Sequence, residues 1–193
     1  DLSHRAPVLK AAGVAQSANL ARWLLGIAVA LPVALVVAVL IVAAQVRGEP
    51  QGPVGLASVP APAADSADCT RLLAALPDKL DGGEQGTLQQ RQLAATTPSG
   101  AAPAGAAAWG EPPVVLRCGL DRPAALTATS RLLMISGVQF LKLPTPGTST
   151  WIAVDRPVYI VVDLPPVTGS GPLQQVATVI ADILPQRDVN IPG

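Results

Sequence analysis

Residues 23–44 read WLLGIAVALPVALVVAVLIVAA, and none of these side chains is charged. As an α-helix with a rise of about 1.5 Å per residue, the stretch is roughly 33 Å long, which matches a bilayer core of about 30 Å. It therefore predicts one transmembrane helix that anchors the chain in the lipid bilayer. The alternative is a signal peptide cleaved after Ala44, although the apolar region of a signal peptide usually covers only about 7–15 residues.

Basic residues near the two ends of this stretch predict its orientation. Arg5, Lys10 and Arg22 precede it, whereas only Arg47 follows it within the next twenty residues. Lys and Arg are retained on the cytoplasmic side of a membrane. Residues 1–22 are therefore expected to form a cytoplasmic tail, and the rest of this single-pass cell-membrane protein is expected to be extracytoplasmic.

Small residues recur at every fourth position of the predicted helix. Residues four apart share one face of a helix, and a ridge of small residues lets membrane helices approach closely. Pro32 removes one backbone donor and is expected to kink the helix, which neighbouring helices can accommodate. The alternative is that the alanine-rich composition produces this register by chance. The predicted helix-packing residues are Gly26, Ala30, Ala34 and Ala38.

The chain after the predicted helix divides into a linker and one small domain. Residues 45–64 are rich in Pro, Gly and Ala, which favours extended polyproline geometry with a reach of up to about 50 Å. The alternative use of such a segment is to lie across a partner's surface. Residues 65–193 are sufficient for one hydrophobic core.

The charge of the chain excludes one class of partner. Lys and Arg number 13, Asp and Glu number 13, and the formal net charge is zero. The basic residues are scattered, so the chain lacks the electrostatic footprint of a nucleic-acid-binding protein.

Cys69 and Cys118 both follow the predicted span, on the side where oxidising conditions permit a disulfide. A bridge between them would close a loop of about 50 residues and stabilise the fold by about 4 kcal/mol in the loop-entropy model. The alternative is two buried free thiols.

Hydrophobic patterning predicts an α+β domain. A helix capped by Asp65 or Ser66 should end before Pro77, followed by a weak edge strand at 86–95 and a loop at 96–108. The β-branched run 114–118 predicts a central strand. Two antiparallel hairpins and a final helix over 172–184 should follow, giving an antiparallel sheet with one or two covering helices. The hairpin strands are expected at 131–135, 138–143, 150–154 and 158–164.

The sequence shows no catalytic, cofactor-binding or metal-binding pattern. Its single histidine is His4, in the predicted tail, so the outer part lacks the imidazole of Ser-His-Asp and Cys-His mechanisms. We therefore expect no cofactor and no enzymatic activity. Trp109 and Trp151 are the candidates for a contact surface. The acidic residues without a paired pattern are Asp78, Asp81, Glu84, Glu111 and Asp163.

A block of sequence resembles a known family. Residues 107–119 read AAWGEPPVVLRCG, a Cys-x-x-Leu-x-x-x-Leu-Pro run begins at Cys69, and residues 137–140 read GVQF. These features resemble the actinobacterial proteins grouped as domain of unknown function 3515, over about residues 66–185. The resemblance implies an exported or membrane-anchored protein without a settled activity, and it supports pairing of Cys69 with Cys118.

One position departs from the pattern of that family. A late Gly-Arg pair precedes the last strand in family members, whereas this chain has Asp155 and Arg156. Because Asp tolerates positive φ less readily than Gly, the departure predicts a changed turn.

Three functions are consistent with these features. The first is a non-enzymatic accessory or assembly subunit of a larger membrane protein complex in an actinobacterial cell envelope, with respiratory complexes as the first class to examine. The second is an envelope-binding module that recognises a peptidoglycan or lipid component through its tryptophans and Pro-rich loops. The third, least supported by the residues, is a carboxylate-based hydrolase.

Overall fold

The computed structural model describes residues 30–41, 52–95 and 101–191. The chain divides into two compact units, Asp1–Pro50 and Gln51–Gly193. In the first unit, residues 30–41 form a helix. The rest of the predicted span and the predicted tail lie outside the described residues. Within the described ranges, no helix combines the length and the apolar character that crossing a membrane requires.

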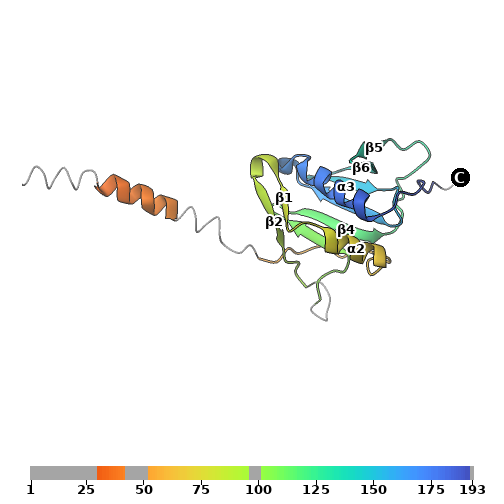
Figure 1. Ribbon diagram of the computed structural model, residues 1–193, viewed down its shortest axis with the longest axis horizontal. Helices are drawn as coiled ribbons and strands as arrows, with labels where there is room; N and C mark the ends of the chain where they lie inside the picture. The colour runs from red at the N-terminus through yellow and green to blue at the C-terminus, as the bar shows by residue number, and fades with distance from the viewer. Residues whose placement is uncertain (1–29, 42–51, 96–100, 192–193) are drawn as a thin grey trace, which may run out of the picture. The chain divides into compact units, whose positions relative to one another are not determined.

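The second unit is built on one antiparallel sheet, as the sequence predicts (Figure 1). The eight strands lie in the order β1-β2-β3-β4-β8-β7-β6-β5, and every neighbouring pair is antiparallel. The predicted central strand is β4, between β3 and β8. The strands are β1 (Lys79–Asp81), β2 (Thr87–Arg91), β3 (Ala106–Trp109), β4 (Val114–Leu120), β5 (Leu132–Ile135), β6 (Val138–Thr145), β7 (Thr148–Ala153) and β8 (Tyr159–Leu164).

Two helices, α2 (Ala67–Ala75) and α3 (Gly171–Ile183), pack on one face of this sheet (Figure 1). Ser66 is the N-cap of α2, and its Oγ accepts a hydrogen bond from the backbone N–H of Cys69 at 3.3 Å. Two short 3₁₀ helices, η1 (Gly83–Gln85) and η2 (Pro166–Thr168), lie in the connections. The fold is therefore the predicted α+β class, with both helices sharing one core.

Alternating residues of β4 serve the two faces of the sheet. Val114, Leu116 and Cys118 are completely buried in the core beneath the helices. Val115 and Arg117 point the other way, since successive strand residues face opposite sides. This second face is covered too, so β4 is buried on both faces.

The first cover of the second face is residues 52–64, here called the strap. Val54 and Leu56 of the strap pack against Ala108 and Val115. Val54 also forms an isolated parallel bridge with Leu93. Most of the predicted linker therefore belongs to the domain, and the compact unit begins at Gln51 rather than at the expected position 65. Apolar residues spaced between the prolines account for this docking.

The second cover lies over β6, β7 and β8. Leu126, from the connection between β4 and β5, packs against Leu141, Ile152 and Val161. Val189, beyond α3, adds to the same cluster. The core of this unit is therefore three clusters, one beneath the helices and two on the opposite face.

Two elements differ from the sequence-based expectations. The strand expected at the sheet edge is β2, which lies between β1 and β3, and the edge is β1. The expected loop at 96–108 ends in β3, whereas residues 96–100 lie outside the described ranges. β1 is too short to show a pattern, and β3 begins with alanines of low β propensity. Pairing with neighbours in the sheet stabilises both as strands.

Gly119 fixes the path of the strap. The backbone N–H of Ala63 donates to the carbonyl oxygen of Gly119 at 3.0 Å. A Cβ at position 119 would lie 2.3 Å from the carbonyl carbon of Ala63, and Gly119 has a φ of +86°. Only a residue without a side chain allows this approach and this backbone conformation.

Gly119→Ala should therefore destabilise the fold more than the same substitution at a glycine that also has a positive φ but has free space for a Cβ. Gly147 provides that control, because its φ is +74° and nothing lies within 4 Å of an added Cβ. We expect Gly147→Ala to cost about 1–2 kcal/mol and Gly119→Ala a further 1–3 kcal/mol, approximately, for overpacking. Urea unfolding measures both. Equal losses would show that the strap does not press on Gly119.

Candidate functional site

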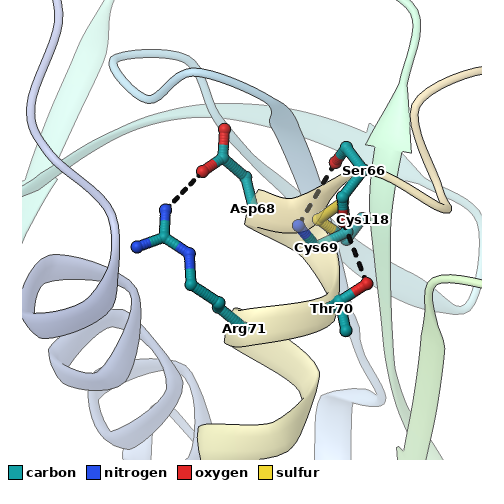
Figure 2. Close-up of polar contacts among 6 residues, drawn as sticks. All are labelled: Ser66, Asp68, Cys69, Thr70, Arg71 and Cys118. Atoms are coloured by element: carbon teal, nitrogen blue, oxygen red, sulfur yellow. Dashed lines mark hydrogen bonds and ion pairs between the residues drawn. A yellow bond between two sulfur atoms is a disulfide. The ribbon is translucent and has the colours of Figure 1, made fainter.

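The predicted disulfide is present and joins the first helix of the domain to its central strand (Figure 2). The Cα atoms of Cys69 and Cys118 are 5.7 Å apart, and both side chains are completely buried. Disulfides persist in oxidising compartments, so the bridge indicates an extracytoplasmic location for this unit.

Around the bridge, the first turn of α2 is held by local contacts (Figure 2). Thr70 Oγ1 donates to the carbonyl oxygen of Ser66 at 3.0 Å, and Arg71 Nη2 lies 2.6 Å from Asp68 Oδ1. These exposed contacts stabilise the helix rather than form a binding site.

The structure separates the two tryptophans that the sequence offers as a contact surface. Trp109 is completely buried, and its Nε1 donates to the carbonyl oxygen of Pro77 at 2.9 Å. Trp109 is therefore a core residue and is not available to a partner. Trp151 is half-buried. Its ring and that of Phe140 are nearly perpendicular, and the Lys142 ammonium lies 4.8 Å from the centroid of the Trp151 ring.

The helix-packing residues fall into two groups. Gly26 lies outside the described residues. Ala30, Ala34 and Ala38 lie in the described helix of residues 30–41, and all three are exposed. Their spacing places them on one face.

A row of polar side chains crosses the sheet face opposite the helices. Of its members, only Asp163 is a candidate from the sequence alone, and there it has no partner. Arg117 Nη1 on β4 lies 3.1 Å from Asp163 Oδ2 on β8. Thr150 Oγ1 on β7 donates to Asp163 Oδ1 at 2.6 Å, and Thr145 Oγ1 on β6 is 2.9 Å from Thr150 Oγ1. The Arg117 and Asp163 side chains are only 18% and 25% exposed.

A small cavity lies beside this row. It has a volume of about 230 Å³, is partly open to solvent, and is lined by the strap, the connection before β3, and β4. Its charged lining residues are Arg117 and Asp65. The cavity therefore has one basic and one acidic side chain in its lining, and the basic one is already paired with Asp163.

A second charged pair is fully buried. Asp155 and Arg156 have side chains 0% and 2% exposed, and Arg156 Nη1 lies 3.0 Å from Asp155 Oδ2. Asp155 Oδ1 accepts from the backbone N–H of Gln139, and Arg156 Nη2 donates to the carbonyl oxygen of Gly137 at 2.8 Å. The pair thus ties the β7–β8 connection to the start of β6.

The remaining acidic candidates lie on the surface. Glu111 pairs with Arg91, and Asp81 Oδ1 accepts from the backbone N–H of Gly83 at 2.9 Å. Among the residues the structure describes, no three His, Cys, Asp or Glu side chains converge as a metal site would need. The exposed members of the candidate set are Asp78, Asp81, Glu84 and Glu111.

The two edges of the sheet differ. At β1, the side-chain amide of Gln175 on α3 accepts from the backbone N–H of Asp81 and donates to its carbonyl oxygen, at 3.2 and 3.4 Å. Lys79 and Asp81 also place charges on that edge. At β5, residues 132–135 read LLMI, and Met134 is 61% exposed.

Comparison with known proteins identifies the family. The family model described as "Protein of unknown function (DUF3515)" matches residues 29–189. The chain belongs to the DUF3515 family. No curated protein and no solved structure matches it.

The resemblance block of this DUF3515 chain has structural roles. Trp109 fills the core, Arg117 anchors the polar row, Cys118 forms the disulfide, and Gly119 accommodates the strap. Asp155, where the resemblance led us to expect a changed turn, is not among the residues of positive φ, and Ser136 is the only such non-glycine residue described. Asp155 therefore places a buried carboxylate on an ordinary backbone conformation.

Removing the bridge should destabilise this DUF3515 chain strongly. We expect Cys69→Ala with Cys118→Ala to lower the free energy of unfolding by about 2–5 kcal/mol, measured in urea. The single variant Cys69→Ala should show a similar loss. A free-thiol assay on denatured, unreduced wild type should detect no reactive thiol, and two thiols per chain would contradict the bridge.

Breaking the buried ion pair should also destabilise the fold. Asp155→Ala leaves the Arg156 guanidinium buried without its partner, with an expected loss of about 3–5 kcal/mol in chemical denaturation. The exposed Asp121 serves as the matched control, and Asp121→Ala should change stability by no more than about 0.5 kcal/mol. Equal effects of the two variants would contradict a structural role for the pair.

Proposed function

We propose that this chain is a non-enzymatic, membrane-anchored accessory or assembly subunit of a larger membrane protein complex in an actinobacterial cell envelope. Respiratory complexes are the first class to test. The predicted helix of residues 23–44 would dock on membrane helices of the complex, and the extracytoplasmic domain would complete the contact. The observation that carries this proposal is the docked strap.

The strap shortens the reach of the domain from its proposed anchor. Residues 52–64 pack on the sheet through Val54 and Leu56, so residues 45–51 are the only chain left between the proposed span and the strap. Seven residues extend at most about 24 Å, about half of the reach expected for the whole Pro-rich segment. A partner close to the bilayer is therefore favoured over a cell-wall component farther out.

Several polar contacts secure the strap where the chain enters the domain. Arg91 donates from its guanidinium to the carbonyl oxygen of Gly52 and, at 3.1 Å, to that of Gly110. The backbone N–H of Val54 donates to the carbonyl oxygen of Gln92 at 2.8 Å. These contacts hold the strap against the sheet, so only the chain before residue 52 is left to act as a tether, which suits a subunit kept close to its anchor.

The proposed anchor carries the features of a packing helix. Ala30, Ala34 and Ala38 share one face of the described helix, and their small side chains permit close approach by another helix. Pro32 lies within the same helix. Both features are accommodated by neighbouring membrane helices.

Affinity purification of the tagged chain from native membranes in mild detergent, followed by mass spectrometry, tests the proposal. Wild type should recover a stoichiometric set of membrane subunits. Ala34→Leu, like Gly26→Leu, should reduce that recovery about fivefold or more, corresponding to roughly 1 kcal/mol of lost helix packing. Val36→Phe is the control, because residue 36 faces away from the ridge.

A second arm tests the strap directly. A Gly/Ser insertion of about twenty residues before residue 52 lengthens the tether. The longer tether lowers the effective concentration of the domain at its partner, so recovery of the same subunits should fall. If wild type recovers no stoichiometric partner, the proposal is wrong. If Ala34→Leu and Val36→Phe recovered the partner subunits equally well, the ridge of small residues would not be the face by which the helix docks.

A further inference from the structure

The turn between β5 and β6 fixes which backbone groups of β5 face outward. Ser136 and Gly137 form the two-residue connection, and both have positive φ, +46° and +77°. This is the signature of a type I′ hairpin. Ile135 and Val138 therefore form the hydrogen-bonded pair next to the turn, and Leu133 forms the next such pair with Phe140.

Leu132 and Met134 consequently turn their backbone N–H and C=O groups away from β6. Antiparallel pairs alternate between hydrogen-bonded and non-hydrogen-bonded positions, so every second residue of an edge strand points outward. Among the described residues, none outside β6 hydrogen-bonds to the main chain of Leu132 or Met134. The edge of β5 is thus open for another strand.

This edge lacks the protection that the opposite edge has. The side-chain amide of Gln175 occupies both backbone groups of Asp81 on β1, and charges flank that strand. β5 has no charged residue and no proline between Leu132 and Ile135, although charges and prolines commonly prevent edge-to-edge pairing. Met134 is a large apolar side chain that is 61% exposed there.

We propose that β5 pairs in antiparallel fashion with β5 of a second copy of this chain, about a two-fold axis at Leu133. In this register Leu132 lies opposite Met134 of the second copy, and Met134 lies opposite Leu132 of the second copy. The outward groups of both residues are then satisfied in both copies. The pairing joins two sheets into one continuous sheet, and it rests on the geometry of β5 independently of the proposed function.

The sequence of β5 makes a second copy the fitting occupant. When two copies of β5 pair in antiparallel fashion, the outward-facing Leu132 of each copy meets the outward-facing Met134 of the other. The contacts are therefore the same in both copies, as a two-fold interface requires. Arg131 would lie opposite Ile135 of the second copy, so no like charges face each other. Leu132 already packs against the cluster around Leu141. Met134, on the same face of the strand, would extend that apolar surface across the interface.

Cysteine cross-linking of the full chain in mild detergent tests the register. At the axis, Leu133 faces Leu133 of the second copy in a non-hydrogen-bonded pair, with Cα atoms about 4.5 Å apart, within disulfide range. Leu133→Cys should give a reducible dimer in more than about half of the protein after mild oxidation. Both native cysteines are bonded to each other and contribute no background.

Two variants serve as controls, one for the register of the pairing and one for random encounters between molecules. In Met134→Cys, the two new thiols are offset by two residues along the strands, at a Cα distance of roughly 8 Å or more, so cross-linking should be about tenfold lower. Ser136→Cys, in the exposed turn, reports random encounters. Equal cross-linking of all three variants would overturn the proposed register.

A charge on the edge provides a test that needs no added thiol. Met134→Lys replaces an exposed side chain, so the fold should persist with an unchanged circular dichroism spectrum. It should convert the wild-type dimer to a monomer by light scattering, and it should abolish cross-linking in Leu133→Cys. A wild type that is monomeric at about 100 μM, or a Met134→Cys variant that cross-links in membranes to a different protein, would refute pairing with a second copy.

Discussion

The disulfide between Cys69 and Cys118 is the constraint on which the rest of the domain depends. It fixes α2 to β4, the strand from which the sheet extends in both directions. The residues beside Cys118 hold two further parts of the fold: Arg117 contacts Asp163 on β8, and Gly119 accommodates the strap. Three consecutive residues therefore organise the helix layer, the polar row and the strap.

This arrangement gives the sheet a cover on each face by different means. Beneath the helices, the core is formed by regular side-chain alternation from the strands. On the other face, irregular segments supply single apolar residues, Val54 and Leu56 from the strap and Leu126 from the β4–β5 connection. The polar row lies on this second face, where Asp163 satisfies Arg117 and Thr150 together. Polar side chains whose hydrogen bonds are satisfied by one another in this way can be partly buried without a large energetic penalty.

Local sequence patterns predicted much of this fold correctly. Ser66 is a cap, Pro77 follows the helix that it was expected to end, and Val114 begins the central strand. The Ser136 turn lies between two strands, and α3 closes the domain with its apolar residues buried. The elements that escaped prediction, β1 and β3, are short or alanine-rich, and their conformation comes from pairing with neighbours rather than from their own residues.

The candidate sites were less predictable because they depend on long-range contacts. No local pattern distinguishes Trp109, which is fully buried, from Trp151, which is partly accessible. The pairing of Arg117 with Asp163 joins residues 46 positions apart. The buried pair of Asp155 and Arg156 is adjacent in sequence, but its burial follows from contacts with Gly137 and Gln139 on another part of the sheet.

The sequence by itself determined the family, the α+β class, the pairing partners of the disulfide and the apolar character of residues 23–44, because each is carried by residue type and spacing along the chain. Only the tertiary structure decided that the Pro-rich segment is a strap, that β1 is a protected edge and that β5 is an open one. Those properties arise from which segments meet in space. A strand edge is open or covered according to its neighbours, and its own residues do not specify them.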